Sequence, residues 1–571
     1  MPQKSRKCSI DNAKECPKEC PKKPSMVHWY NPLQLIKTGV QVASSTVLEA
    51  LYDYRLIESF FTSSQEEFDY SDNNEFWIDY VADLGDGWNP TYTIACLLAR
   101  ENMLLQNPQG ESYETQRGNV LIMGGDEVYP TANRERYQQQ LVGPYECAFE
   151  ESQESHPHVF AIPGNHDWYD GLISFMRLFC QRVQRRWIGG WRTRQDRSYF
   201  AIKLPHHWWL LGVDVQLESD IDGPQLEYFT KIAKCMKEGD RIILCTPKPD
   251  WIYGEIYDPK MENNLAYLEQ KVIPKDVKVL VRISGDIHHY RRHEATDGSG
   301  VQMITSGGGG AFLHPTNGPE VENINYGPKD KKVPFQLKKN YPSKNRSRLI
   351  AFRNLLFPIF NYWFGMVTGI IYTMLNLFLG NQMHQTGTLG EGLKDSLWDL
   401  LHSPSGILCA LFILFAFVLF TETHKKKYRW TAGPIHGFSH ILAILIVGCA
   451  AVRITAFLGL EAVTTKIFFS LIVFIGGYLV GSFLVGLYLL ISLNIFGRHA
   501  NEAFSALRVQ NYKNFLRIHL ATDGTLTVFP IGVDRVPRKW VYREAGTSEP
   551  KLIPKKSEIK AHLIENPIRI P

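Results

Sequence analysis

The sequence has 571 residues, of which 44% are hydrophobic and 21% are charged, and its formal net charge at pH 7 is only +4. A chain of this length exceeds one ordinary hydrophobic core, so we expect two or more domains. So small a net charge gives no electrostatic case for nucleic acid binding, and we expect no nucleic acid partner.

The N-terminal segment, residues 1–26, is rich in lysine and has no apolar core. This composition predicts a disordered basic tail and is not the pattern of a secretory signal peptide. Cys8, Cys16 and Cys20 lie in the tail, but they offer one spaced pair and one distant thiol with no histidine nearby. Disorder is therefore favoured over a metal knuckle.

Residues 27–320 alternate short apolar runs with longer amphipathic segments. The predicted strands are Phe76–Ala82, Val120–Met123, Val159–Ile162, Ser198–Ile202, Trp208–Val213, Arg241–Cys245, Val277–Ile283 and Val301–Thr305. The predicted helices are Tyr92–Leu105, Gln225–Lys237 and Glu262–Lys271. Alternating strands and helices predict a layered α/β domain.

Residues 321–353 are polar and basic, and we expect a linker that approaches a membrane. Residues 354–497 then contain four apolar stretches, each at or near the ~20 residues that cross a bilayer. They cover roughly residues 354–380, 405–421, 436–458 and 467–497. Because they are almost free of charge, they favour a transmembrane domain of about four α-helices over buried helices of a soluble domain. We therefore expect a multi-pass integral membrane protein in contact with membrane lipids.

The charges that flank these stretches alternate along the chain. Arg346 and Arg353 precede the first stretch, an acidic loop follows it, and residues 425–427 after the second are all lysine. The positive-inside rule then places the first domain and both termini in the cytoplasm.

The C-terminal segment, residues 498–571, contains Asp523-Gly524 between the apolar runs Phe515–Ala521 and Leu526–Pro530. Asp-Gly between two such runs predicts a β-hairpin. The sequence indicates no chemistry for this segment.

Four segments of the first domain share one layout, in which a predicted strand runs into a loop that carries an acid or a histidine. They are Asp83–Gly87, Gly124–Asp126, Gly164–Asp167 and Gly285–His289. Side chains at the carboxyl ends of neighbouring strands can converge. Carboxylates, an amide and imidazoles together suit divalent ions of the Mn, Fe or Zn class. Each segment alone is more often a turn or a helix cap, but four in this order indicate a metal site.

The order Asp, Gly-Asp, Gly-Asn-His-Asp, Gly-x-x-His resembles the calcineurin-like metallophosphoesterases over about residues 75–315. More closely, it resembles a membrane-attached branch with Asp-x-Gly-Asp-Gly and Gly-Asp-x-His-His-Tyr motifs. The resemblance implies an α/β fold with two mixed sheets flanked by helices in four layers. It also implies a phosphatase-like hydrolase that cleaves a phosphate mono- or diester by attack of a metal-bound hydroxide.

The resemblance assigns a ligand role to four residues. Asp126 would bridge two divalent metal ions, Asp83 and His288 would hold the first ion, and Asn165 would hold the second.

It also assigns two catalytic roles. His166 would stabilise the transition state or protonate the leaving oxygen, and Asp167 would orient the His166 ring.

Three positions depart from the family pattern. Gly85 stands where the first motif normally ends in histidine, and Asp86 is the obvious substitute ligand. Asp286 replaces another histidine and can still bind a hard metal. Pro247 replaces a third histidine and cannot ligate, which leaves the second ion uncertain.

Three further side chains are possible additions to the site. His289 and His314 could supply a missing ligand, and Lys248 could place a positive charge where the second metal normally sits. The alternatives are therefore two ions or one.

The main alternative to an enzyme is a signalling or scaffold membrane protein that kept this fold and lost turnover. Pro247 argues for it, and the retained acids and histidines argue against it. A transporter is disfavoured because Arg453 is the main ionisable residue well inside an apolar stretch. Attachment to a membrane makes a lipid-borne phosphate ester a plausible substrate, but the sequence does not specify one.

Overall fold

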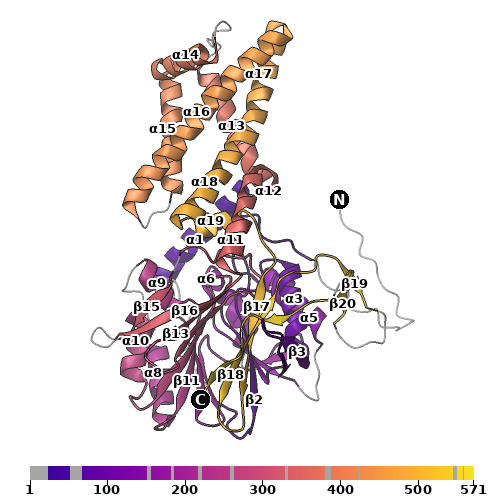
Figure 1. Cartoon of the computed structure of the whole chain (residues 1–571), viewed down its shortest axis with the longest axis vertical. Helices are drawn as coiled ribbons and strands as arrows, with labels where there is room; N and C mark the ends of the chain where they lie inside the picture. The colour runs from indigo at the N-terminus through magenta and orange to yellow at the C-terminus, as the bar shows by residue number, and fades with distance from the viewer. Residues whose placement is uncertain are drawn as a thin grey trace.

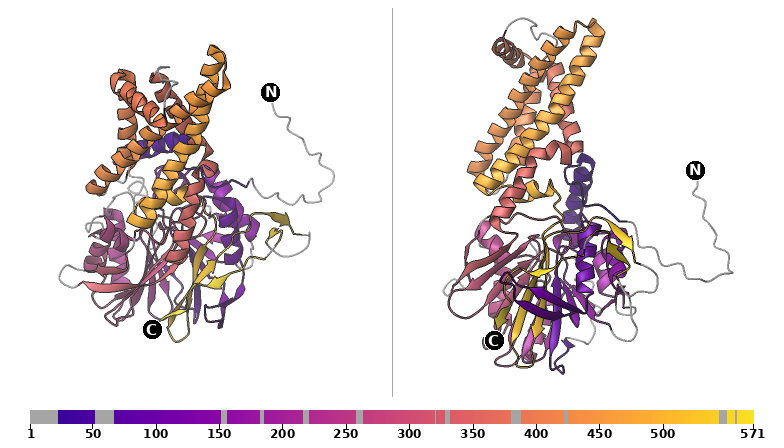
Figure 2. Two further views of the ribbon diagram at one scale, coloured as in Figure 1. Left: turned by 45° about the horizontal axis from the view of Figure 1, so that its top comes forward. Right: turned by 45° about the vertical axis from the view of Figure 1, so that its right-hand side comes forward.

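The computed structural model describes residues 23–51, 67–150, 156–181, 185–215, 221–257, 263–319, 321–327, 332–379, 388–421, 425–543, 550–556 and 558–571. Residues 1–22 of the predicted basic tail lie outside these ranges. Figure 1 shows two parts, an α/β domain built on two sheets and a bundle of long helices that rises from one end of it. Both further views, in Figure 2, show the bundle at the same end.

The first sheet has nine strands and contains most of the strands predicted after residue 190. Its central strands run parallel, and antiparallel strands complete both sides. In spatial order they are β1 (Phe68–Asp69), β9 (Phe200–Leu204), β10 (Trp208–Gly212), β11 (Arg241–Thr246), β12 (Lys278–Ser284), β14 (Gln302–Ser306), β13 (Tyr290–Ala295), β16 (Val333–Tyr341) and β15 (Asn323–Tyr326).

The second sheet also has nine strands and is assembled from both ends of the chain. In spatial order they are β21 (His562–Leu563), β18 (Leu526–Val533), β17 (Lys513–Leu520), β2 (Phe76–Val81), β5 (Val120–Met123), β6 (His158–Ala161), β8 (Trp191–Thr193) and β7 (Trp187–Ile188), with β22 (Ile568–Ile570) also paired to β18. Strands β2, β5, β6 and β8 are parallel neighbours.

Three apolar clusters show that the domain has four layers. One cluster lies between the sheets and joins residues such as Ile78 and Ile122 to Leu210 and Ile243. A second packs α8 (Gly223–Cys235) on the outer face of the first sheet. A third packs α3 (Trp88–Leu98), α5 (Gly143–Ala148) and α7 (Ile173–Phe179) on the outer face of the second. The expected architecture of two mixed sheets flanked by helices is confirmed.

Two predictions about local structure are corrected. The helix expected over Tyr92–Leu105 ends at Leu98, and residues Asn102–Gln106 form β3, which pairs with β4 (Ser112–Gln116). The segment expected to be a linker, residues 321–353, contains β15 and β16 of the first sheet. Alternate side chains of β15 are buried, whereas β16 buries only Phe335 and Tyr341. The polar residues of β16, such as the exposed Lys338, had given the segment its polar appearance.

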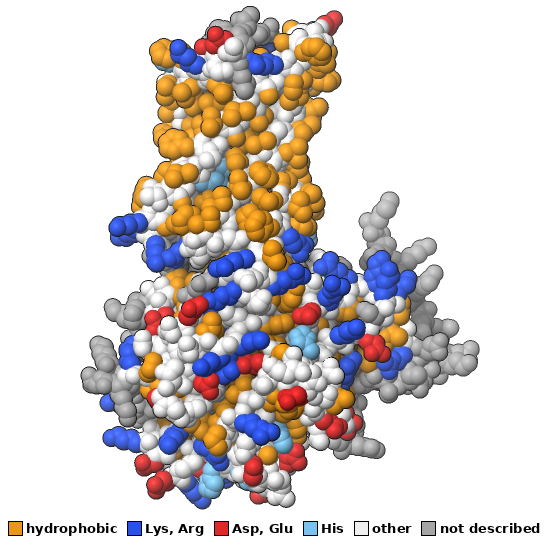
Figure 3. Space-filling view, in the orientation of Figure 1, with side chains coloured by type: hydrophobic (Ala, Val, Ile, Leu, Met, Phe, Trp, Pro, Cys, Tyr) orange, Lys and Arg blue, Asp and Glu red, His pale blue; other side chains and the backbone are white. Residues whose placement is uncertain are grey.

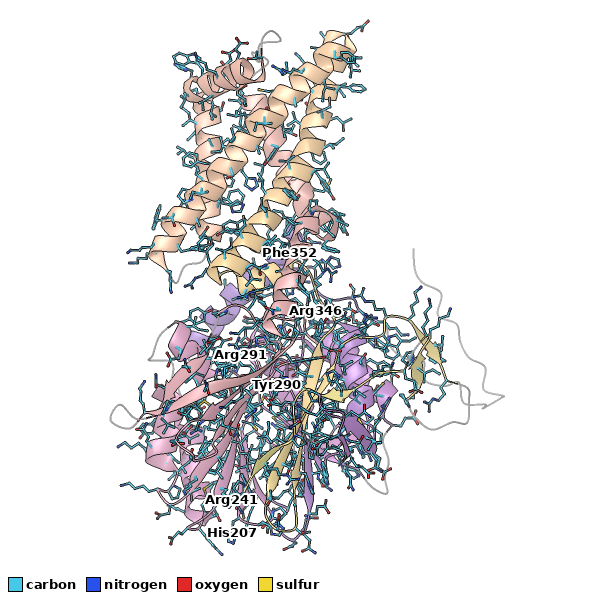
Figure 4. All side chains as sticks on the ribbon, viewed as in Figure 1. His207, Arg241, Tyr290, Arg291, Arg346 and Phe352 are labelled. Carbon is cyan, nitrogen blue, oxygen red and sulfur yellow. The ribbon has the colours of Figure 1, made fainter. Side chains whose placement is uncertain are left out.

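The remainder of that segment, α11 (Lys344–Ala351) and η4 (Phe352–Leu356), leads into the helix bundle. Figure 4 labels Arg346 and Phe352 at this junction. Arg346 Nε donates a hydrogen bond of 2.6 Å to the Tyr512 hydroxyl, close to the point where the chain returns from the bundle.

The bundle contains two helices that are long and apolar enough to cross a membrane, Lys426–Leu458 and Ala462–Phe496. The first is α16, and the second runs from α17 (Ala462–Gly476) through η6 (Gly477–Gly481) to α18 (Ser482–Phe496). Two bent helix pairs also qualify if each is one span, so the described residues contain two, or up to four, segments that are long and apolar enough to cross a membrane. The pairs bend by 63° before α13 (Tyr362–Phe378) and by 96° between α14 (Leu389–His402) and α15 (Pro404–Phe420).

The C-terminal segment is part of the α/β domain. Strands β17 and β18 pair as the hairpin predicted from Asp523-Gly524, and β17 also pairs antiparallel with β2. The chain therefore builds one half of the second sheet before the helix bundle and completes it after the bundle.

A buried ion pair joins these two halves. Arg517 on β17 and Asp79 on β2 are opposite each other in the ladder, and their side chains meet at 3.1 Å with almost no exposure. The Arg517 guanidinium also donates to the carbonyl oxygens of Thr115 and Arg100. A buried charge with these partners is costly to leave unpaired.

We expect Arg517→Leu to lower the free energy of unfolding by about 3–5 kcal/mol, because it strands the Asp79 carboxylate. The matched control is Lys551→Gln, which removes the more exposed Lys551–Glu150 pair and should change stability by less than ~1 kcal/mol. Chemical denaturation of the full chain in detergent measures both. Equal effects of the two substitutions would contradict the role of the buried pair.

Candidate metal centre

Three acids predicted as ligands directly follow parallel strands. Asp83 comes after β2, Asp126 after β5 and Asp286 after β12, at the ends of the strands that face the membrane helices. All three have positive φ values, 57°, 55° and 68°. Non-glycine residues seldom adopt this backbone, and such strain is often found at functional sites.

Asp83, Asp126 and His288 form a compact buried group, in which one possible ligand atom from each residue lies within 4.8 Å of the others. His288 Nδ1 lies 2.7 Å from the Phe312 carbonyl oxygen. When Nδ1 donates this hydrogen bond, the lone pair on Nε2 is available to a metal ion. Metal-binding histidines are usually oriented in this way. The expectation that these three residues come together is met by the geometry, whereas their roles as ligands stay a prediction.

The charge of this group fits a bound cation. Burial, and then the neighbouring Asp126 and Asp286, raise the pKa of Asp83 well above its usual value. Burial is also the main cause that raises the pKa of Asp126 to about 7. The Asp83 Oδ2 atom is buried with no hydrogen-bond partner. Carboxylates held this way are stabilised by a divalent ion.

Two glycines give these carboxylates the space that they occupy. A Cβ atom on Gly164 would lie 2.1 Å from Asp126 Oδ1, and one on Gly307 would lie 1.9 Å from Asp83 Oδ2. Any side chain at either position would displace a carboxylate, so the glycine-rich loops are part of the construction of the site.

Tyr129 belongs to the site and was not predicted. Its hydroxyl lies 3.0 Å from Asp126 Oδ2 and 2.9 Å from His288 Nε2, between two members of the group. The signal in the sequence was its position three residues after Asp126, on the loop that follows β5.

His166 and Asn165 lie on α6 (Asn165–Trp168) and line the same cavity as Asp126. The His166 backbone N–H donates to Asp126 Oδ1 at 2.9 Å, and its Nδ1 lies 2.7 Å from the Pro130 carbonyl oxygen. Asn165 Nδ2 donates to the Tyr169 hydroxyl at 2.9 Å.

The role predicted for Asp167 is corrected. Its carboxylate accepts hydrogen bonds from the backbone N–H groups of Glu127 and Gly164 and from the Tyr137 hydroxyl. Asp167 therefore fixes the two loops that carry Asp126 and His166, and the Pro130 carbonyl orients the His166 ring.

Asp86 is separate from the group of three. Both of its carboxylate oxygens accept backbone hydrogen bonds, from Val27 at 2.8 Å and from Phe312 at 3.2 Å. The structure therefore uses Asp86 to fix the N-terminal segment and the glycine-rich loop. Asp286 lines the cavity, and its carboxylate accepts a short hydrogen bond from Tyr253.

The additional residues considered at the second site lie nearby. Pro247 packs against Gly125, and Lys248 lies 3.8 Å from Asp250. His314 stacks on His288 with ring centroids 3.9 Å apart. Both ring nitrogens of His289 are buried without a hydrogen-bond partner.

Lys513 on β17 adds a buried positive charge that the sequence did not indicate. Its Nζ donates to the Ala311 carbonyl oxygen. Burial lowers the pKa of Lys513 to about 7, and the nearby Asp86 and Asp83 oppose that shift. The C-terminal segment, residues 498–571, therefore contributes to the electrostatics of the site as well as to the second sheet.

A cavity of about 570 Å³ opens onto these residues. Its lining includes Asp126, His166 and His288 of the α/β domain together with Gly497–Glu502 and Ser505, directly after the last apolar helix. The candidate metal centre therefore faces the junction with the bundle of long apolar helices.

No family model and no curated protein matches the chain. Among solved structures, the chain is similar to GAP50, the anchor in the inner membrane complex of Plasmodium, with 13% identity and a TM-score of 0.29 over 48% of this chain and 92% of that one. It is also similar to PhoD, with 9% identity and a TM-score of 0.27 over 42% of this chain and 58% of that one. The fold class assigned above rests on the strand order and the four layers.

The raised pKa values predict how metal binding depends on pH. Below about pH 7 a proton occupies Asp126, so metal and proton compete and the apparent affinity for Mn²⁺ should fall by about tenfold per pH unit. Above pH 7 Asp126 is deprotonated, so its competition between proton and metal ends and its contribution to the pH dependence should level off. Calorimetric titration of the metal-free protein between pH 5.5 and 8.5 measures this, and a pH-independent affinity would contradict the assignment.

Proposed function

We propose that the protein is a membrane-tethered, metal-dependent hydrolase that acts on phosphoric ester bonds. The observation that carries the proposal is the buried group of Asp83, Asp126 and His288, of which Asp126 and His288 line an accessible cavity. Helices that could anchor this cavity at a bilayer support the tether.

In the proposed reaction, each residue of the site would have a separate role. Asp83, Asp126 and His288 would hold a divalent ion, which lowers the pKa of a water and offsets charge on the phosphoryl oxygens. His166 is held at Nδ1 by the Pro130 carbonyl, so its protonated ring would present Nε2–H to the leaving oxygen. Lys513 would offset the negative charge that remains around the group.

We propose one firmly bound ion. Asn165 and Asp286 line the same cavity and could hold a second, as the resemblance implies. However, Asp286 is engaged by Tyr253, and Pro247 offers no ligand atom. The positive charge of Lys248 acts on Asp286, which further disfavours a second cation.

Asp126→Ala and His288→Ala should each lower metal-dependent hydrolysis of an aryl phosphate by on the order of 100-fold or more, because each removes a ligand. His207→Ala is the matched control. His207 lies at the far end of the domain in Figure 4, and this variant should keep the wild-type rate. A wild-type rate in Asp126→Ala would contradict the mechanism, and no turnover in any metal-loaded protein would favour the scaffold alternative.

The metal content of Pro247→His tests the number of ions. Wild-type protein should retain about one equivalent of Mn²⁺ after dialysis, and Pro247→His should retain more, since it supplies an imidazole beside Gly125. Pro247→Ala is the control and should retain one equivalent. Two equivalents in the wild type would contradict the single-ion proposal.

We propose a cytoplasmic orientation for the α/β domain, supported by the lysines and arginines that gather where the membrane helices meet it (Figure 3). The disulfide bond of Cys147 argues against a cytoplasmic orientation, because disulfides persist in oxidising compartments. Protease protection of the α/β domain in sealed vesicles decides between the two.

A further inference from the structure

We propose that the substrate is a membrane phospholipid that stays partly in the bilayer while it is cleaved. In this arrangement an acyl chain lies in a groove between α16 and α18, a phosphate close to the acyl chains lies in a cationic pocket at the membrane surface, and the ester to be cleaved lies at the metal centre. The inference rests on the proposed function and adds the class of its substrate.

The first observation is an apolar groove of about 290 Å³ in the membrane part. Its walls are α16, with Ala432 and Ile435, and α18, with Leu487 and Ile491. Ile435 is 66% exposed, so the groove opens to the surface that the bilayer covers. A groove of this composition on a membrane-spanning surface suits an acyl chain.

The second observation is a pocket of about 670 Å³ below the groove. It shares Phe496 with the groove, and it shares Gly497 and Arg498 with the metal-site cavity. The three spaces therefore adjoin in the order groove, surface pocket, metal centre. This order matches a lipid whose head group points away from the bilayer.

The surface pocket is suited to an anion. Its lining includes three cations from three separate elements, Arg348 of α11, Lys425 before α16 and Arg498 after α18. The two carboxylates among the described lining residues, Glu322 and Glu255, have partners of their own. Glu322 pairs with Lys344 at 2.5 Å, and Glu255 accepts a hydrogen bond of 3.1 Å from the Asn325 backbone. Lysines and arginines next to the ends of membrane-spanning helices attract lipid phosphates.

The third observation is helix α1 (Pro32–Leu51), which flanks the metal-site cavity. Thr38 lines the cavity, and Gln41 accepts a hydrogen bond of 3.0 Å from Thr131. On another face, Leu33, Ile36 and Val40 are 77%, 65% and 64% exposed. Their spacing forms an apolar stripe, as in helices that lie in the membrane interface. Figure 1 places α1 between the sheets and the membrane helices, which sets the cavity at that interface.

The test measures lipid binding by the full chain in detergent, with no metal added. The probe is phosphatidylinositol 4-phosphate with a fluorescent acyl chain, because it carries one phosphate next to the glycerol and a second farther out. The competitor is its deacylated form, which has the same phosphates and no acyl chains. We expect saturable binding, with the deacylated form at least tenfold weaker as a competitor than the unlabelled lipid.

Two variants and two matched controls locate the binding. Ala432→Trp fills the groove and Lys425→Gln removes a pocket cation, and each should weaken lipid binding at least fivefold. Ala456→Trp, on an exposed position of α16 outside the groove, and Lys426→Gln, next to Lys425 but outside the pocket lining, should bind as the wild type does. Equal competition by the deacylated form, or wild-type binding by both test variants, would overturn the inference.

Hydrolysis of a soluble aryl phosphate separates this inference from the proposed function. Ala432→Trp and Lys425→Gln should keep the wild-type aryl phosphatase rate, because neither residue lines the metal-site cavity. If Asp126-dependent hydrolysis persists while the lipid results fail, the lipid inference is wrong and the hydrolase proposal stands. If no hydrolysis is found in any metal-loaded protein, both are overturned.

Discussion

The insertion of β17 between β18 and β2 is the constraint on which the rest of the structure depends. This strand follows the last long apolar helix of the bundle, yet it lies in the interior of a sheet. The other half of that sheet precedes the bundle in the chain. The buried pair of Arg517 and Asp79 fixes the register of β17. The α/β domain is therefore attached to the helix bundle at two points, through α11 and through α19 (Ala500–Ser505).

Two attachments determine where the candidate metal centre faces. A domain on a single flexible linker could present its site in any direction, whereas here the segment after α18 lines the cavity. The same returning chain carries Lys513 into the charged surroundings of Asp83 and Asp86. The segment directly after α18 thus forms one wall of the cavity, so the cavity lies next to the long apolar helices.

Strands and loops with local signals were predictable from the sequence. The apolar run Val120–Met123 forms a strand with those bounds, and Asp83, Asp126 and His288 come together because each follows a strand of the sheets. Long-range pairing was not predictable. Nothing local in Val333–Tyr341 indicates that it joins β13, and nothing local in Lys513–Leu520 indicates that it joins β2.

The site residues that the sequence missed or misassigned depend on such long-range contacts. Tyr129 lies between Asp126 and His288 only once the two sheets are assembled, and Asp86 is occupied by backbone groups more than fifty residues away. The most direct test of the central claim is anomalous diffraction from crystals of the full chain grown with Mn²⁺. We predict a peak bounded by Asp83, Asp126 and His288, and a well-ordered site without that peak would contradict the account.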